Sequence, residues 1–261
     1  MTEIQYLGQN GFKVSFGSVT MYFDLYLSDC VREMTGEGTR NYEPPILAED
    51  IIDADYYFIS HEHLDHLDPQ TVRKVSKASP QTVFICPYPH IGILMDLEIP
   101  RERVIAAKAH EKITLKTREG DVDVIPIPEK HEEYTIIDGC HGTLGYIVRK
   151  GEVQFYHAGD CVADQALAEE LKHYGQMNIM FVPINGHDWK RFYRGIMGNM
   201  NYREALDLCH YVGTDLVIPM HYDLFENNTE NPAYFVDYLY QNYRRQKFKM
   251  FMPGETLYLE L

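Results

Sequence analysis

The chain contains 261 residues, which is long enough for one large layered domain with a sizeable buried core. Hydrophobic residues make up 45% of it and charged residues 24%, ordinary values for a soluble globular protein. A formal net charge of −15 disfavours nucleic acid as a partner, because the phosphate backbone binds basic surfaces. No apolar run is long enough to cross a membrane, and the first residues, MTEIQYLGQNG, do not resemble a signal peptide.

Cysteine usage indicates the compartment. The five cysteines are scattered along the chain and never form a C-x-x-C pair. We interpret them as reduced thiols and predict a cytoplasmic protein that has neither a membrane nor a nucleic-acid partner.

The first part of the chain is typical of strands joined by short turns and followed by a long loop. The strand patterns IQYL, FKVSF and VTMYFD are separated by glycine-containing turns at residues 8–11 and 17–18. Residues 28–50 contain two glycines and two prolines, so we predict an irregular surface loop. A loop of this length in a compact domain usually serves a function, here as a lid, a subunit interface or both.

Strands and helices alternate after this loop. Asp68 and Pro69 supply an N-cap and a first-turn proline for a helix over about 69–78, and a second helix is predicted over about 89–97. The remaining strand patterns are DYYFIS, TVFIC, VDVIPIP, GTLGYIV, EVQFYHAGD, NIMFVPI and DLVIPM, with helices predicted at about 162–173, 202–212 and 232–243. Strand-rich halves that are each followed by helices predict an α/β fold, a four-layer αββα sandwich in a single domain over residues 1–261.

The hexapeptide HEHLDH is the strongest functional signal, and it follows a predicted strand directly. In extended backbone, side chains two residues apart project to the same side, so His61 and His63 can converge on one cation. Asp65 and His66 lie where the chain turns toward a helix, within reach of a second cation. Four such groups in six residues favour a metal site over a solvated polar loop.

Three distant residues are placed to complete the coordination. His131 follows VDVIPIP, Asp160 ends EVQFYHAGD, and His221 follows DLVIPM. Strand ends are the usual location of site residues in α/β sheets. Taken alone, each residue is equally well explained as a surface histidine or a turn aspartate. Their shared placement at strand ends favours the interpretation as metal ligands. Histidine and carboxylate ligands without cysteine suit Zn²⁺, Mn²⁺ or Fe²⁺, and the donor set alone does not choose among them.

Taken in order, these motifs resemble the metal motifs of the metallo-β-lactamase superfamily. HEHLDH, His131, the HAGD segment and the histidine of MHYDLF agree with that superfamily in order and in placement. Asp24, which closes MYFD, is similar to its early aspartate, which supports the metal loop without binding metal. The resemblance implies two divalent metal ions, one held by His61, His63 and His131, the other by Asp65, His66 and His221, with Asp160 as the bridge.

A narrower resemblance concerns the substrate. PINGHDW (183–189), GNMN (198–201) and PMHYDLFENN (219–228) are similar to segments of the L-ascorbate-6-phosphate lactonase group, although this chain is shorter than those enzymes. The resemblance implies a hydrolase that opens a small, phosphorylated sugar lactone, favours Mn²⁺ and assembles as a homo-oligomer.

The chemistry expected of such a site is the attack of a metal-bound hydroxide on an ester carbonyl. Two divalent cations lower the pKa of a bound water from about 15.7 towards 7. Asp65 is the candidate catalytic residue, placed to take the proton of this water and pass it to the leaving alkoxide. The alternative is that Asp65 is a ligand only.

Candidate substrate contacts lie in the second half of the chain. The guanidinium groups of Arg191 and Arg194, near Asn199, suit bidentate contacts with a phosphate. Asn185 and His187 are candidates to bind sugar hydroxyls. The competing interpretations are a solvated basic stretch for the arginines and a simple turn for the Asn-Gly pair.

Two other functions stay open. A phosphodiesterase or nuclease would use the same site, because two cations also clamp an in-line phosphoryl displacement. The acidic charge balance disfavours a polynucleotide substrate. A non-catalytic metal-binding oligomer is the third possibility, and the complete set of ligand types disfavours it.

Overall fold

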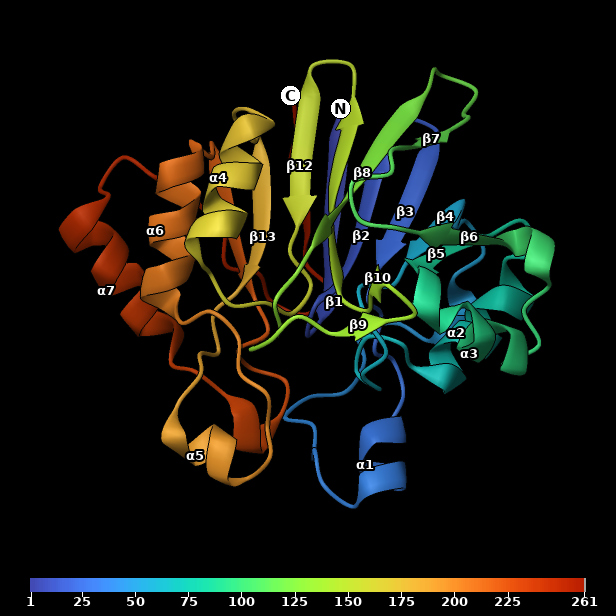
Figure 1. Ribbon diagram of the computed structural model, residues 1–261, viewed down its shortest axis with the longest axis horizontal. Coiled ribbons are helices and arrows are strands. Elements are labelled where there is room, and N and C mark those ends of the chain that lie inside the picture. The colour runs from blue at the N-terminus through green and yellow to red at the C-terminus, as the bar shows by residue number, and fades with distance from the viewer. Residues whose placement is uncertain (261) are drawn as a thin grey trace.

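The computed structural model describes residues 1–260 and contains two seven-stranded sheets that pack face to face (Figure 1). In spatial order, the first sheet consists of β16 (Thr256–Leu259), β1 (Thr2–Gly8), β2 (Gly11–Phe16), β3 (Val19–Phe23), β4 (Tyr56–Phe58), β5 (Val83–Pro87) and β6 (Val104–Ala107). The second consists of β15 (Lys247–Phe248), β14 (Leu216–Met220), β13 (Ile179–Pro183), β12 (Val153–His157), β11 (Leu144–Lys150), β8 (Val122–Pro128) and β7 (Ile113–Leu115). A short hairpin of β9 (Ile136–Ile137) and β10 (Cys140–His141) lies outside both sheets.

Alternating apolar residues decide which faces of the two sheets meet. Along β2, Phe12, Val14 and Phe16 are buried at every second position, as the period of a strand requires. The Phe12 ring centroid lies 4.7 Å from that of Phe181 on β13, across the interface between the sheets. Burying a side chain of this size contributes roughly 1.5–3 kcal/mol, so this aromatic layer holds the sheets together.

Helices cover the two outer faces. The buried residues of α2 (Pro69–Ala78) and α3 (Ile91–Asp96) share a core cluster with the outer side of the first sheet. The helices α4 (Gln165–His173), α6 (Tyr202–Val212) and α7 (Pro232–Asn242) pack on the second sheet. The predicted four-layer αββα sandwich is therefore confirmed (Figure 1). Among residues 1–260, none of the helices combines the length and apolar character that crossing a membrane requires.

The direction of the strands places the carboxyl ends of several of them at one edge. Strands β3 to β6 run parallel in the first sheet, and β12 to β15 run parallel in the second. Strand β8 has the same direction as β12, because both pair antiparallel with β11. The segments that follow β4, β8, β12 and β14 carry the predicted metal ligands.

The 28–50 segment is more regular than predicted. It contains the helix α1 (Cys30–Thr35) and the 3-10 turn η1 (Ala48–Asp50). Helix α1 ends at Thr35 and is capped by Gly36, whose left-handed φ of 78° suits a residue without a Cβ. The expectation of an irregular loop throughout was wrong because a six-residue helix is too short to produce a periodic apolar pattern.

Other differences concern helix boundaries and short elements. The predicted helix at 89–97 is a 3-10 turn, η2 (Tyr88–His90), that leads into α3. Helix α4 begins at Gln165 because the Asp164 carboxylate caps it by accepting from the Leu167 N–H at 2.9 Å. The elements that the sequence pattern did not predict are β6, β7, β9, β10, β15, β16, α5 (Trp189–Tyr193), η3 (Arg101–Arg103) and η4 (Glu226–Asn228).

Removing the N-cap of α2 should destabilise the fold more than removing that of α4. The buried Asp68 carboxylate accepts from Gln70 N, Ser28 N and the Thr71 backbone and hydroxyl, so it joins α2 to the start of the 28–50 segment. We expect Asp68→Ala to lower the free energy of unfolding by about 2–4 kcal/mol, measured by urea denaturation, because buried donors lose their partner. The matched control Asp164→Ala should cost about 1 kcal/mol. Equal losses in the two variants would contradict this account.

Candidate metal centre

The histidine loop begins where β4 ends and is folded tightly by its own backbone. The Ile59 N–H still donates to Ile85 of β5, so His61 starts at a fixed point of the sheet edge. The N–H groups of His66 and Leu67 both donate to the His63 carbonyl, at 2.9 and 2.8 Å. Because of this turn, side chains that are close in the sequence reach two neighbouring groups of candidate ligands.

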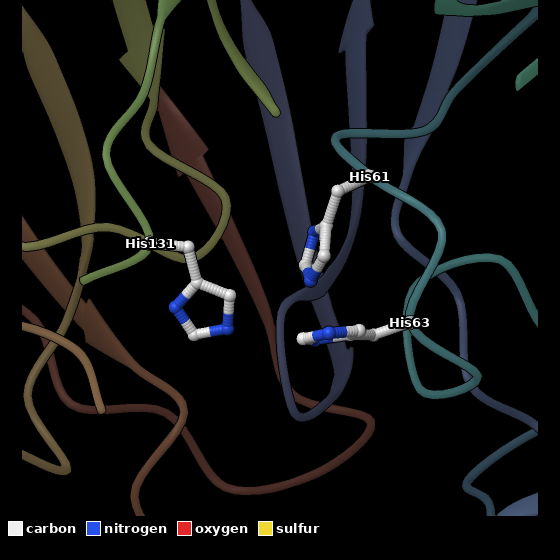
Figure 2. Close-up of side chains that lie close together, drawn as sticks. All are labelled: His61, His63 and His131. Carbon is white, nitrogen blue, oxygen red and sulfur yellow. The ribbon is translucent and has the colours of Figure 1, made fainter. Parts of the chain in front are cut away.

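The first group contains only histidines. The rings of His61, His63 and His131 point toward one another (Figure 2), and one nitrogen from each lies within 4.8 Å of the others. Nδ1 of His131 faces the Gly198 carbonyl at 3.2 Å, which leaves its Nε2 as an acceptor. Nε2 of His61 and Nε2 of His131 are buried without a hydrogen-bond partner. Buried acceptors without partners are costly, and a cation would satisfy them.

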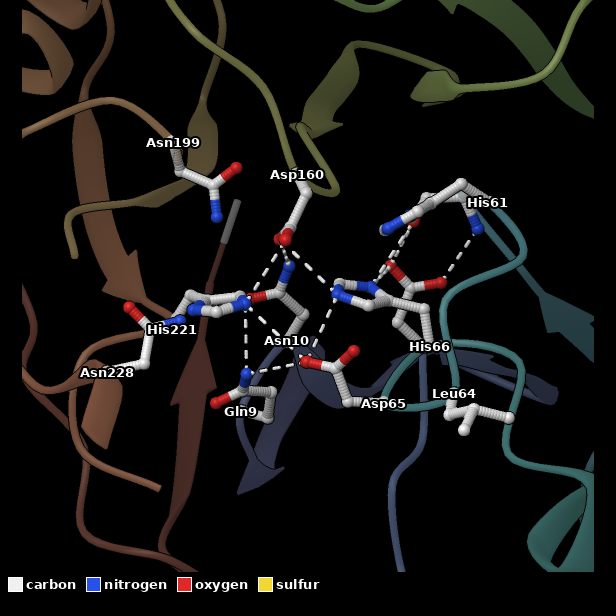
Figure 3. Close-up of polar contacts among 12 residues, drawn as sticks. Gln9, Asn10, His61, Leu64, Asp65, His66, Asp160, Asn199, His221 and Asn228 are labelled. Atoms are coloured by element: carbon white, nitrogen blue, oxygen red, sulfur yellow. Dashed lines mark hydrogen bonds and ion pairs between the residues drawn. The ribbon is translucent and has the colours of Figure 1, made fainter. Parts of the chain in front are cut away.

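The second group combines carboxylates with histidines. Nε2 of His66 lies 3.7 Å from Asp65 Oδ2 and 3.4 Å from Asp160 Oδ1. Nε2 of His221 lies 3.6 Å from Asp65 Oδ2 and 3.1 Å from Asp160 Oδ2 (Figure 3). Two ligand atoms that each lie about 2.1 Å from one cation are roughly 3.0–3.4 Å apart, so the contacts of Asp160 with these two histidines match a divalent cation and those of Asp65 are slightly longer.

Asp160 lies between the two groups. Besides His66 and His221, its carboxylate faces Nε2 of His131 at 3.7 Å. The residue is buried and follows β12 by three positions, at the end of the HAGD segment. This position is the one that a bridging ligand would need, and the bridging role stays a prediction.

Asp24 supports the loop from behind. Its carboxylate accepts from the Ser60 N–H at 2.8 Å, from the Ser60 hydroxyl at 2.6 Å and from Nδ1 of His66 at 2.9 Å. The Ser60 oxygen in turn accepts from Nδ1 of His61 at 2.9 Å. In the neutral form of both rings, Nδ1 therefore carries the proton and Nε2 is the nitrogen available to a cation.

The pKa shifts of the histidines differ between the two groups, because burial dominates in the first and neighbouring charges dominate in the second. In the histidine group, burial and the neighbouring imidazoles lower the pKa of His61, and burial likewise lowers the pKa of His131. In the second group, burial opposes the charged form of His221, but Asp160 and Asp65 outweigh it and raise the pKa of His221 to about 9. The charges of His66 and His221 likewise outweigh burial and hold the pKa of Asp65 below its usual range. A cation would therefore compete with protons mainly in the second group.

Two site residues were not identified from the sequence. Gln9 and Asn10 lie in the turn between β1 and β2, and both are buried. The Gln9 amide donates to Asp65 at 2.8 Å, and the Asn10 amide donates to Asp160 at 2.8 Å (Figure 3). The flanking glycines signal a turn, and nothing local in the sequence indicates that this turn points inward.

Several of the candidate ligands line a cavity of about 460 Å³. Its polar lining includes His63, Asp65, His131, Asp160, His221, Glu37, Glu62, Arg194, Asn227 and Asn228. Its apolar lining is formed by Val31, Leu64, Ile196, Met197 and Phe225. A small molecule in this cavity would therefore contact the candidate ligands on one part of its surface and apolar side chains on another.

The 28–50 segment forms one wall and is held in place by polar contacts. The Arg40 guanidinium donates to the carbonyls of Tyr26 and Ser28, at 3.2 and 2.8 Å. The Tyr42 hydroxyl donates to the Asp223 carboxylate at 2.9 Å, two residues after His221. The segment is thus attached to the loop that carries a predicted ligand.

Of the predicted substrate contacts, only Arg194 lines the cavity. Its guanidinium has no hydrogen bond or ion pair within the described residues. Arg191 is engaged elsewhere, because it pairs with Asp188 and donates to Asn228 at 2.8 Å. It contributes to the shape of the α5 loop rather than facing the cavity.

The three remaining candidates are also engaged within the fold. Asn199 donates to Asn185 at 3.1 Å, and Asn185 donates to Asn228 at 3.1 Å, so both buried amides support the cavity wall from behind. His187 lies on the surface, 3.1 Å from the Glu204 carboxylate, which also caps α6. The structure does not bring these three side chains to the cavity.

Comparison with known proteins places this architecture in a family. A family model described as the beta-lactamase superfamily domain matches residues 25–222. A metal-dependent hydrolase from Pyrococcus furiosus is 27% identical over 271 residues, which cover 99% of this chain and 100% of that protein. A metallo hydrolase from Ignicoccus hospitalis has a similar structure, with a TM-score of 0.72, 21% identity and coverage of 100% and 99% of the two chains. A metallo-beta-lactamase fold protein from Bacillus subtilis gives a TM-score of 0.68 at 13% identity and covers 98% of each chain. The chain belongs to the beta-lactamase superfamily.

Proposed function

We propose that this protein is a metal-dependent hydrolase of a small ester, specifically a phosphorylated sugar lactone of the L-ascorbate 6-phosphate type. The observation that carries the proposal is the convergence of buried imidazole nitrogens and carboxylates at the floor of an open cavity. The names of relatives such as the Pyrococcus furiosus protein support metal-dependent hydrolysis. The narrower lactone assignment is supported by the motif resemblance and by the position of Arg194.

The donor set divides the proposed metal binding between two positions. His61, His63 and His131 would hold one divalent cation, and Asp65, His66 and His221 would hold another, with Asp160 facing both. Mn²⁺ is the proposed metal, while the same ligand types also suit Zn²⁺ or Fe²⁺. When bound, such cations lower the pKa of a coordinated water and polarise a carbonyl oxygen.

The side chains around the cavity would bind and orient the substrate. Asp65 faces the cavity with its side chain 17% exposed, so its carboxylate can take a proton at the floor and return it to a leaving oxygen. The guanidinium of Arg194, which lines the cavity and has no hydrogen bond or ion pair among the described residues, suits a phosphate. The apolar lining residues, which include Leu64 and Phe225, would exclude water from the bound substrate.

We further propose that the chain acts as a single domain, in the cytoplasm and as a homo-oligomer, on a small molecule rather than on nucleic acid. All five cysteines are unpaired, and four of them are buried, which supports a reducing compartment.

Removing one histidine of the first group should remove cation binding before it affects the fold. We expect His63→Ala to lower turnover by at least roughly 100-fold, beyond the loss typical of residues that only support a ligand. Cation content by elemental analysis should fall, while the melting temperature of the chelator-treated protein stays unchanged. His173→Ala, which changes an exposed histidine on α4, is the control. Near-normal turnover of His63→Ala would remove His63 from the ligand set.

The substrate class can be tested by turnover of L-ascorbate 6-phosphate with Mn²⁺, beside the phosphodiester bis-p-nitrophenyl phosphate. We expect lactone opening to exceed diester cleavage and to be lost in Asp65→Asn, whose amide cannot accept the proton. Preferred cleavage of the diester would replace the lactone assignment with a phosphodiesterase.

Arg194 should determine the preference for an anionic substrate. We expect Arg194→Ala to raise KM for the phosphorylated lactone by about 10–100-fold, because a charge-assisted bond contributes roughly 1.5–3 kcal/mol. The KM for the parent lactone without phosphate should not change. Lys190→Ala removes an exposed cation outside the cavity and should leave both KM values as they are. Equal effects of Arg194→Ala on the two lactones would exclude phosphate recognition by this residue.

A further inference from the structure

The turn between β1 and β2 delivers two buried amides to the candidate metal centre. Gln9 is 1% exposed and Asn10 is fully buried. Gln9 has a φ of 55°, in the left-handed region that residues with a Cβ seldom adopt. A buried amide is stable only where its polar atoms find partners, so the contacts of these two side chains explain their placement.

Gln9 joins two residues of the second group. Its Nε2 donates to Asp65 Oδ2 at 2.8 Å and faces Nε2 of His221 at 2.9 Å (Figure 3). The orientation of the amide follows from chemistry, because a carboxylate can only accept and the amide nitrogen can only donate. The Gln9 carbonyl also accepts from the His221 N–H at 3.2 Å, which ties the two turns together through the backbone.

Asn10 makes the equivalent contact with the other carboxylate. Its Nδ2 donates to Asp160 Oδ1 at 2.8 Å, and its backbone carbonyl accepts from Nε2 of His157 at 3.0 Å. His157 is itself packed on the Phe23 ring, with centroids 5.0 Å apart, so Asn10 is held from both sides. One turn therefore fixes one oxygen of each carboxylate in the centre.

We propose that Gln9 and Asn10 are positioning residues that set the orientation of Asp65 and Asp160 for cation binding. This inference rests on the proposed function, since it concerns the same site. When an N–H group donates to one oxygen of a carboxylate, the carboxylate is held in one orientation. Its remaining lone pairs then point in a fixed direction, so less conformational entropy is lost when a cation binds. Without the donor, the carboxylate rotates and must be ordered at the moment of binding.

The two amides act on different parts of the centre. Among the candidate ligands, Asp65 forms close contacts with His66 and His221, so we expect Gln9 to affect the second group. Asp160 faces His131 as well as His66 and His221, so Asn10 affects both groups. This difference distinguishes a positioning role from a general loss of structure. A general loss of structure would weaken both cation sites, whichever of the two amides is replaced.

The experiment is calorimetric titration of chelator-treated protein with Mn²⁺ and with Zn²⁺. Gln9→Met and Asn10→Leu keep the buried volume and remove the donor. Gln5→Met is the matched control, because Gln5 lies on β1, the strand that leads into this turn, and its amide donates to the Gly254 carbonyl. Melting temperatures of the cation-free proteins provide the measure of folding.

We expect Gln9→Met to weaken one of two binding steps by about 10–100-fold and to leave the other within about threefold. Asn10→Leu should weaken both steps, and Gln5→Met neither. Wild-type isotherms in Gln9→Met, or equal weakening of both steps by it with an unchanged melting temperature, would overturn the inference alone. No cation binding by the wild-type protein would overturn the proposed function and this inference with it.

Discussion

The buried carboxylate of Asp24 is the contact on which the geometry of the centre depends. It accepts three hydrogen bonds from Ser60 and His66, and through the Ser60 hydroxyl it also determines the proton position on His61. A charge at 1% exposure is stable only with such donors, so the loop and the aspartate stabilise each other. Asp24 belongs to neither ligand group, yet its contacts orient one ring in each, His61 and His66. The left-handed backbone of Asp24, with φ of 41°, indicates that the fold holds this arrangement against a local preference.

The two ligand groups differ in charge, and this difference has chemical consequences. His61, His63 and His131 offer nitrogen ligands only, whereas Asp65 and Asp160 bring carboxylate oxygens to His66 and His221. Nitrogen ligands favour cations such as Zn²⁺, and oxygen ligands favour harder cations such as Mn²⁺. Under the proposed function, the carboxylate-rich position would thus be the more selective for Mn²⁺. Asp160, which faces both, would couple the two positions electrostatically.

The sequence predicts those parts of the centre that depend on local geometry. HEHLDH is recognisable because its spacing alone brings side chains together, and His131, Asp160 and His221 are recognisable because strand ends share an edge. Gln9 and Asn10 are different, since a Gly-flanked turn looks the same whether it points to solvent or to the interior. Which of the two arginines faces the cavity also depends on α5, a helix too short for a periodic pattern.

Under the proposed function, the charged groups that line the cavity would orient the substrate. The lining contains the carboxylates of Asp65, Asp160, Glu37 and Glu62 and the guanidinium of Arg194. In a chain with a net charge of −15 and with no cation bound, an anionic substrate would be repelled by these carboxylates and attracted by Arg194. Cations held by the two ligand groups would reverse this field locally and polarise the ester carbonyl, while Arg194 would hold the phosphate. Under the proposed function, cation binding and the orientation of an anionic substrate would therefore be coupled, and the apolar residues of the cavity lining would strengthen these interactions by excluding water.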